Sequence, residues 1–254
     1  MAASVAQIWR HPIKGIGAEA LSETRITRNL PLPLDRAWAL LQVGGEAGTG
    51  WRSCSNFLRG AKGPSLMAIT ARSETAEDGA VKITLAHPDR PEISIDPDRD
   101  GGALMDWVRP IYPEERPAPA ALIKAPPQGM SDANFPSISI LNRASLRALG
   151  QKLGQNLDER RFRGNLWLEG LAPWEEFDLV GKTLRIGMGE EAVEIEVIEP
   201  IGRCRATEAN PETGRKDAHV LAGLSNGWGH TQFGVYATAR SNGCIRSGDP
   251  VEIL

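Results

Sequence analysis

Apolar residues in this chain fall into short runs in which apolar and polar positions alternate. Alternation with a period of two residues is typical of half-buried β-strands, and the abundant glycines and prolines between the runs are typical of turns. The pattern predicts strands over residues 5–9, 37–43, 66–71, 81–85, 137–141, 166–168, 183–186, 193–197 and 234–239. A mostly β protein of the α+β class is therefore expected.

Few segments show the 3.6-residue repeat of an amphipathic helix. The clearest covers residues 143–153, where leucines recur at helical spacing, Asn142 supplies an N-cap and Gly154 ends the helix. Shorter helices are expected over residues 102–108 and 218–224. The helices are thus predicted to be a minor part of the fold.

Residues 109–119 contain four prolines. Proline lacks a backbone donor and stiffens the chain, which is typical of a linker or a domain boundary. We therefore predict an N-terminal domain over residues 1–115 and a C-terminal domain over residues 120–254.

With 254 residues and a hydrophobic fraction of 41%, the chain is long enough to bury a substantial core. Its formal net charge of −3 and its scattered basic residues argue against nucleic-acid binding. No apolar run is long enough to span a bilayer, and the N-terminus lacks the features of a secretory signal. We therefore expect a cytoplasmic protein with neither a nucleic-acid nor a membrane partner.

The three cysteines, Cys54, Cys204 and Cys244, are widely separated and show no paired spacing. This argues against a disulfide framework, a structural zinc site or an iron–sulfur cluster. A redox function would therefore need electrons from another protein. We interpret Cys54 and Cys244 as structural, with Cys244 in a turn before the last strand.

Cys204 stands apart because Arg203 and Arg205 flank it. Neighbouring cations lower the pKa of a thiol, and a thiolate is both a nucleophile and a soft metal ligand. An inert buried cysteine is the alternative interpretation. Among the histidines, only His11 adjoins a candidate motif, which makes it a candidate acid or base.

Several segments follow one another in an order typical of one family. They are His11-Pro12-Ile13-Lys14-Gly15, Leu34-Asp35-Arg36-Ala37-Trp38, Arg161-Phe162-Arg163-Gly164-Asn165, the pair Arg203-Cys204, Phe233-Gly234-Val235-Tyr236, and the run from Gly243 to Val251. Together they resemble the MOSC family, the molybdenum cofactor sulfurase C-terminal domain, preceded by its N-terminal β-barrel domain. In pattern the chain is most similar to the mitochondrial amidoxime-reducing component and to bacterial reductases of N-hydroxylated bases.

The resemblance implies a β-barrel-like MOSC domain, a smaller N-terminal β-barrel-like domain, and molybdenum cofactor bound between them. In this family the dithiolene of a pterin holds the molybdenum, and the resemblance makes Cys204 the protein's metal ligand and its catalytic residue. The positions that match the family's cofactor contacts are Lys14, Arg36, Arg163 and Arg203, and Asn165 is expected to add an amide contact. Such side chains suit the phosphate of the pterin because they form charge-assisted hydrogen bonds.

The activity that the resemblance implies is the reduction of small N-hydroxylated compounds, independent of pyridoxal phosphate, with electrons from a separate donor protein. A non-catalytic carrier of molybdenum cofactor, or of sulfur on Cys204, is the second hypothesis, and a structural or interaction protein is the third. The chain departs from the family pattern at Gly15, where reductase relatives have serine, and at Asn210, where aspartate is common. Asparagine still supports the turn expected there.

Overall fold

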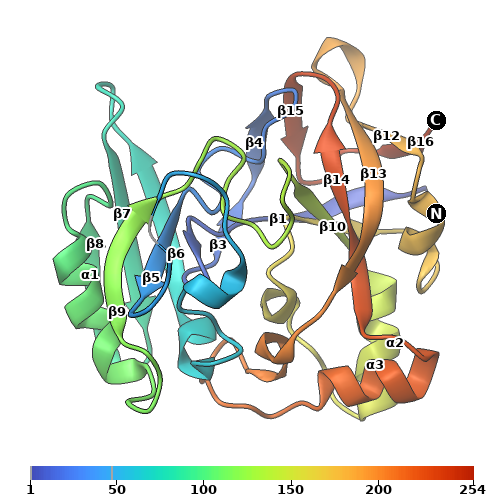
Figure 1. Ribbon diagram of the computed structural model, residues 1–254. Helices are drawn as coiled ribbons and strands as arrows, with labels where there is room; N and C mark the ends of the chain where they lie inside the picture. The colour runs from blue at the N-terminus through green and yellow to red at the C-terminus, as the bar shows by residue number, and fades with distance from the viewer. Residues whose placement is uncertain (1, 47) are drawn as a thin grey trace.

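The computed structural model describes residues 2–46 and 48–254. Its largest element is an eight-stranded sheet in the right-hand part of Figure 1. In spatial order the strands are β16 (Val251–Ile253), β12 (Thr183–Ile186), β13 (Val193–Gly202), β14 (Gln232–Ala239), β10 (Ile138–Asn142), β11 (Leu166–Glu169), β1 (Ser4–Arg10) and β3 (Glu19–Leu21). Neighbouring strands are antiparallel except β10 and β11, which run parallel.

Two three-stranded sheets make up most of the left-hand part of Figure 1. One consists of β2 (Ile13–Lys14), β5 (Trp38–Gln42) and β9 (Pro119–Lys124), and the other of β6 (Thr70–Thr75), β7 (Val81–His87) and β8 (Arg90–Ile95). Helix α1 (Gly101–Val108) packs on β8 and β9. Trp38, Leu85 and Leu104 belong to the buried cluster that joins these elements.

Helices α2 (Arg143–Leu153) and α3 (Val220–Trp228) pack against each other below the eight-stranded sheet in Figure 1. Asn142 caps α2, because its side-chain oxygen accepts a hydrogen bond from the backbone N–H of Ala144 at 2.8 Å. Gly154 ends the helix in the left-handed conformation, with φ of 67°. The cap and the stop predicted for this helix are therefore confirmed.

Short 3-10 helices connect many of these elements. They cover Cys54–Asn56, Pro64–Ala68, Arg109–Ile111, Glu159–Phe162, Glu175–Leu179, Gly189–Glu191 and Arg205–Glu208. The last of them begins directly after Cys204, so the position of that cysteine is set by the end of β13 on one side and by a tight turn on the other.

The two halves of the chain exchange strands. β1 and β3 belong to the eight-stranded sheet, and β4 (Glu23–Ile26) pairs with β15 (Gly243–Arg246) in a two-stranded ribbon. In the other direction, β9 follows the proline-rich segment yet pairs with β5. The domain boundary between residues 115 and 120 stays a prediction. Strands on each side of this boundary pair with strands on the other side. This pairing brings residues near the N-terminus against the C-terminal half.

The mostly β, α+β fold is confirmed, and most of the predicted strands are present with ends that differ by a few residues. The strand predicted over residues 66–71 is wrong, because Pro64 begins a 3-10 helix whose buried Leu66 and Met67 produce the same apolar run. Cys244 is also not in a turn, since it is a buried residue of β15.

Within the described residues, no helix combines the length and the apolar character needed to cross a membrane.

Candidate functional site

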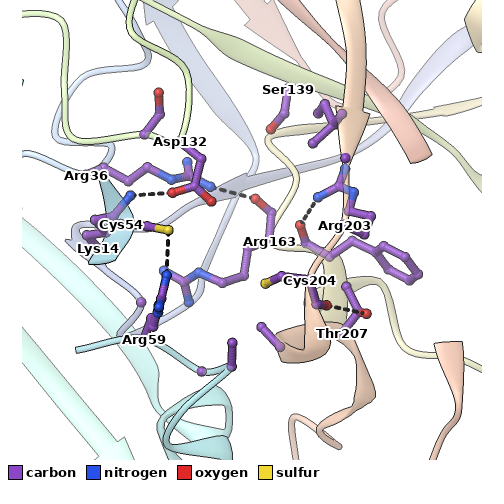
Figure 2. Close-up of a pocket in the computed structure, with 18 of the residues that line it drawn as sticks. Lys14, Arg36, Cys54, Arg59, Asp132, Ser139, Arg163, Arg203, Cys204 and Thr207 are labelled. Carbon is purple, nitrogen blue, oxygen red and sulfur yellow. Dashed lines mark hydrogen bonds and ion pairs between the residues drawn. The ribbon is translucent and has the colours of Figure 1, made fainter. Parts of the chain in front are cut away.

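A pocket lies between the two halves, and residues from both line it (Figure 2). Its lining includes the predicted metal ligand and all the predicted cofactor contacts, namely Lys14, Arg36, Arg163, Asn165, Arg203 and Cys204, but not the candidate acid or base His11. The structure therefore brings together positions that lie up to 190 residues apart in the sequence. Which of them contact a cofactor stays a prediction.

Arg36 is held in the pocket by a rigid turn before β5. Its backbone is left-handed, with φ of 51°, and its N–H donates to the carbonyl of His11 at 2.7 Å. The guanidinium forms an ion pair with the buried carboxylate of Asp35 and donates to the carbonyl of Arg163 at 2.7 Å. Burial alone would raise the pKa of Asp35, but Arg36 and His11 hold it well below its usual range. Arg36 is thus a fixed cation whose charge Asp35 balances.

Lys14 is a buried residue of β2 whose ammonium faces the pocket. Its Nζ donates to Oδ1 of Asp132 at 2.6 Å and to the carbonyl of Met130 at 2.8 Å. Burial lowers the pKa of Lys14, and the carboxylate of Asp132 opposes that shift. Lys14 therefore also has a carboxylate partner, although the Asp132 side chain is 60% exposed.

Arg163 and Arg203 are different, because the hydrogen bonds of each guanidinium go to backbone carbonyls. Arg163 donates to the carbonyls of Gly17 at 3.1 Å and Ile13 at 3.2 Å. Nε of Arg203 donates to the carbonyl of Phe233 at 2.7 Å, and its Nη1 donates to the carbonyl of Phe162 at 2.8 Å. Burial lowers the pKa of Arg163 to about 9, with Arg36 adding to the shift, and burial lowers the pKa of Arg203 to about 10.

These two arginines leave the pocket with unbalanced positive charge. Within residues 2–46 and 48–254, neither guanidinium has a carboxylate within ion-pair distance. Burying a charge without a counter-charge costs several kcal/mol, so such a charge is normally paired or bound to a ligand. The pocket is therefore electrostatically suited to an anion.

Asn165 lines the pocket but is occupied by structural contacts. Its side-chain oxygen accepts from the backbone N–H of Ser139 at 3.1 Å and from the Ser139 hydroxyl at 2.8 Å. Its amide nitrogen donates to the carbonyl of Trp9 at 3.1 Å. These bonds tie β10 and β1 to the segment before β11, which gives Asn165 a structural role whether or not it also contacts a ligand.

Cys204 has a free thiol and an exposed surface that faces the pocket. Its carbonyl accepts from the hydroxyl of Thr207 at 3.0 Å, which fixes the turn that follows. Farther on, the side-chain oxygen of Asn210 accepts from the backbone N–H of Glu212 at 2.8 Å. Asparagine therefore makes the turn contact that the sequence predicted for this position.

The prediction that flanking cations lower the pKa of the Cys204 thiol is wrong. The protein atoms around the sulfur limit its hydration, and this burial raises the pKa. Arg203 acts in the opposite direction, but its N–H groups point at carbonyls, while Arg205 is 68% exposed and pairs with Glu208. Arg203 and Arg205 adjoin Cys204 in the sequence, but neither guanidinium is directed at its sulfur.

We expect Cys204 of metal-free protein to react slowly with iodoacetamide at neutral pH. Because the thiolate is the reactive form and the pKa is raised from the ordinary value of 9.0, the rate should keep increasing above pH 9. Mass spectrometry of the peptide that contains Cys204 measures this rate separately from the other cysteines. A rate that is already maximal below pH 8 would contradict the raised pKa.

The pocket also contains residues that the sequence did not single out. Asp132 precedes β10 in an irregular segment, and Cys54 and Arg59 belong to the N-terminal half. Cys54 was interpreted as structural, but it lines the pocket, where Nη1 of Arg59 donates to its sulfur at 2.7 Å.

His11, in contrast, is fully buried and does not line the pocket. Its burial, together with the nearby charge of Arg163, lowers its pKa to about 3. His11 is therefore neutral at physiological pH and not a proton donor to the pocket.

Protein side chains alone do not make a metal site here. In the described part of the chain, no group of three or more histidine, cysteine, aspartate or glutamate side chains is placed to hold a metal ion. A metal bound at Cys204 would therefore need most of its ligands from another molecule.

Two family models match the chain. The model of the MOSC domain matches residues 130–252, and that of the MOSC N-terminal beta barrel domain matches residues 2–105. A molybdenum cofactor sulfurase of Drosophila grimshawi is 30% identical over 135 residues, which are 50% of this chain and 16% of the sulfurase. The matched part thus spans about a sixth of that relative.

Two solved structures are similar to the chain. The YuaD protein of Bacillus subtilis has a TM-score of 0.48 and 10% identity, covering 100% of this chain and 96% of that one. YiiM of Geobacillus stearothermophilus has a TM-score of 0.33 and 18% identity, covering 46% of this chain and 53% of that one.

Proposed function

The chain is a MOSC-domain protein with the accompanying N-terminal β-barrel domain, and from this premise we propose that it is a molybdenum-cofactor-dependent reductase of N-hydroxylated compounds. Cys204 is the proposed metal ligand and catalytic residue. The proposed substrate is a small N-hydroxylated molecule, and the electrons come from a separate donor protein. Three free cysteines are compatible with the cytoplasm as the proposed location, because thiols stay reduced there.

One observation carries the proposal: a free thiol shares its pocket with two buried guanidiniums that have no carboxylate partner. The phosphate of a pterin cofactor is a dianion near neutral pH, so its charge matches the excess that Arg163 and Arg203 create. The thiol of Cys204 is a soft ligand and suits a redox-active metal that receives its other sulfurs from a dithiolene. The residues present therefore fit the cofactor.

Bound cofactor would supply a metal centre that takes an oxygen atom from the substrate, and the protein's contribution is to bind and orient. Arg163 and Arg203 are already fixed by backbone carbonyls, so they lose little freedom when an anion binds. The protein atoms around the carboxyl group of Asp132 act to raise its pKa, but the ammonium of Lys14 holds it below the usual range, so Asp132 stays ionised. It therefore acts as a hydrogen-bond acceptor rather than as an acid.

The overall reaction consumes two electrons and two protons and releases water for each N–O bond broken. The chain has no iron–sulfur cysteine set and no dinucleotide-binding fingerprint through which electrons would enter. This supports the proposal that a small donor protein docks near the pocket.

The test uses protein made in a host that synthesises molybdenum cofactor, with the metal content determined. Given a chemical reductant or a donor chain, the loaded protein should convert benzamidoxime to benzamidine, while NADH alone should give no product. Loaded protein that is inert toward a panel of N-hydroxylated compounds would contradict the reductase proposal.

A second candidate is a carrier of molybdenum cofactor or of sulfur on Cys204, and it is favoured by the match to a molybdenum cofactor sulfurase. A carrier would pass cofactor to a cofactor-free enzyme and restore that enzyme's activity. The same loaded preparation serves for this measurement, so transfer without turnover would identify the carrier.

A further inference from the structure

Arg59 is a pocket cation from the N-terminal half whose charge is not balanced by a carboxylate. Across residues 2–46 and 48–254 it has no carboxylate within ion-pair distance. Its guanidinium donates a hydrogen bond from Nη1 to the sulfur of Cys54 at 2.7 Å. Sulfur is a weak acceptor, so a carboxylate would replace it readily, with a bidentate charge-assisted bond.

Arg59 differs in position from the other unbalanced arginines. All three side chains are partly buried, but Arg163 and Arg203 are tied to backbone carbonyls, whereas the guanidinium of Arg59 donates to the sulfur of Cys54. Figure 2 shows Arg59 beside Cys54, with Cys204 and Arg203 on the other side of the pocket. An anion that neutralises Arg163 and Arg203 therefore leaves a further positive charge on the opposite wall.

This wall also lies against the segment that follows Cys204. A Cβ atom on Gly60 would be 3.3 Å from the Cβ of Ala206, so the residue after Arg59 lies next to the turn after Cys204. Met67 and Ala206 add apolar lining between them. A small molecule with its acidic group on Arg59 would place its body on this apolar lining, beside Cys204.

We propose that Arg59 is a substrate-specificity residue and that the substrate is an N-hydroxylated compound that also carries a carboxylate. The part of this inference that concerns the N-hydroxyl group rests on the proposed function, whereas the carboxylate subsite depends only on Arg59. The subsite takes the acid end of the substrate, and the N-hydroxyl end is directed to Cys204.

The test measures binding and turnover separately in cofactor-loaded protein. Without a reductant no substrate is consumed, so calorimetric titration gives the Kd of 4-carboxybenzamidoxime and that of neutral benzamidoxime. The wild type should bind the carboxylate compound roughly 10-fold more tightly, as expected for one charge-assisted contact. With reductant, the ratio of the two kcat/KM values should show a preference of the same size.

In Arg59→Gln the two Kd values should become equal while the molybdenum content stays at the wild-type level. Arg72→Gln is the matched control, because Arg72 is a 67% exposed arginine of the same half, paired with Glu74, and it should keep the preference. Equal Kd values in the wild type, or a preference that survives Arg59→Gln, would overturn the proposal. Loss of molybdenum in Arg59→Gln would also overturn it, because Arg59 would then hold the cofactor.

Failure of the reductase proposal would give a different result from failure of the carboxylate subsite. In that case neither compound is turned over, yet the difference in Kd between wild type and Arg59→Gln remains. If no preparation retains cofactor, the titrations are made on the protein as isolated with saturating inorganic phosphate to occupy Arg163 and Arg203, and the same loss of preference in Arg59→Gln is required.

Discussion

We expect Cys204→Ala to abolish reduction of N-hydroxylated compounds while the protein stays folded. The loss in kcat/KM should exceed the roughly 100-fold that is typical when a group merely supporting a metal ligand is mutated. The substitution removes one sulfur at an exposed position, so it creates no core cavity and should change the thermal midpoint little. Steady-state kinetics, metal analysis and the absorption spectrum of the metal centre check these three points.

Cys244→Ala is the matched control for this variant. Cys244 is buried in β15, outside the pocket, and its sulfur lies 3.9 Å from Oε2 of Glu23. Its replacement should cost about 1 kcal/mol of stability and leave activity per bound metal unchanged. Undiminished turnover in Cys204→Ala would remove Cys204 from the mechanism, and unfolding of that variant would show that the cysteine is structural.

Several strands of the fold were predictable because apolar and polar residues alternate along them. β7 and β13 are examples, and both lie within a few residues of their predicted ends. The sequence analysis missed β4, β8, β9 and β15, which have four to six residues. It also missed β2, β3 and β16, because they have only two or three residues, too few for a period to be recognised. Their pairing is decided by the partner strand rather than by their own sequence.

The convergence of the site residues was predictable from the resemblance, but the surroundings of each were not. Asp132 lies in an irregular segment with no motif around it, and only the fold places it on Lys14. Similarly, a sequence places Arg203 beside Cys204 but gives no indication that its guanidinium points at the carbonyls of Phe233 and Phe162. The pKa of the Cys204 thiol is raised because the surrounding protein atoms limit its hydration, and Arg203 only opposes that shift. A sequence shows which charges adjoin a thiol but not how far the fold limits its hydration, so the predicted sign of this shift was wrong.

Charge reversal at Lys14 should have the second large effect. In Lys14→Glu, a carboxylate would replace the ammonium beside Asp132 in a pocket where the side chain is only 6% exposed. At an effective dielectric constant of 20, reversing one charge about 4 Å from a phosphate converts an attraction of about 4 kcal/mol into a similar repulsion. We therefore expect molybdenum content below about a tenth of the wild-type level, from a loss of affinity greater than about 100-fold.

Lys124→Glu separates this local effect from a general effect of charge reversal. Lys124 also pairs with an aspartate, Asp98, at 2.8 Å, but its side chain is 66% exposed, where salt and water screen the charge. The molybdenum content of Lys124→Glu should therefore equal that of the wild type. The molybdenum content of Lys14→Met, which removes the charge without adding a carboxylate, should fall between that of Lys14→Glu and that of the wild type. Circular dichroism should confirm that all three variants are folded.

Because burial lowers the pKa of Lys14, its ammonium should lose its proton, and with it the attraction to the cofactor's phosphate, at a less alkaline pH than an ordinary lysine. Cofactor retention should therefore weaken as the pH rises. Wild-type molybdenum content in Lys14→Glu would mean that Lys14 and Asp132 form a structural ion pair and that the anion binds elsewhere in the pocket.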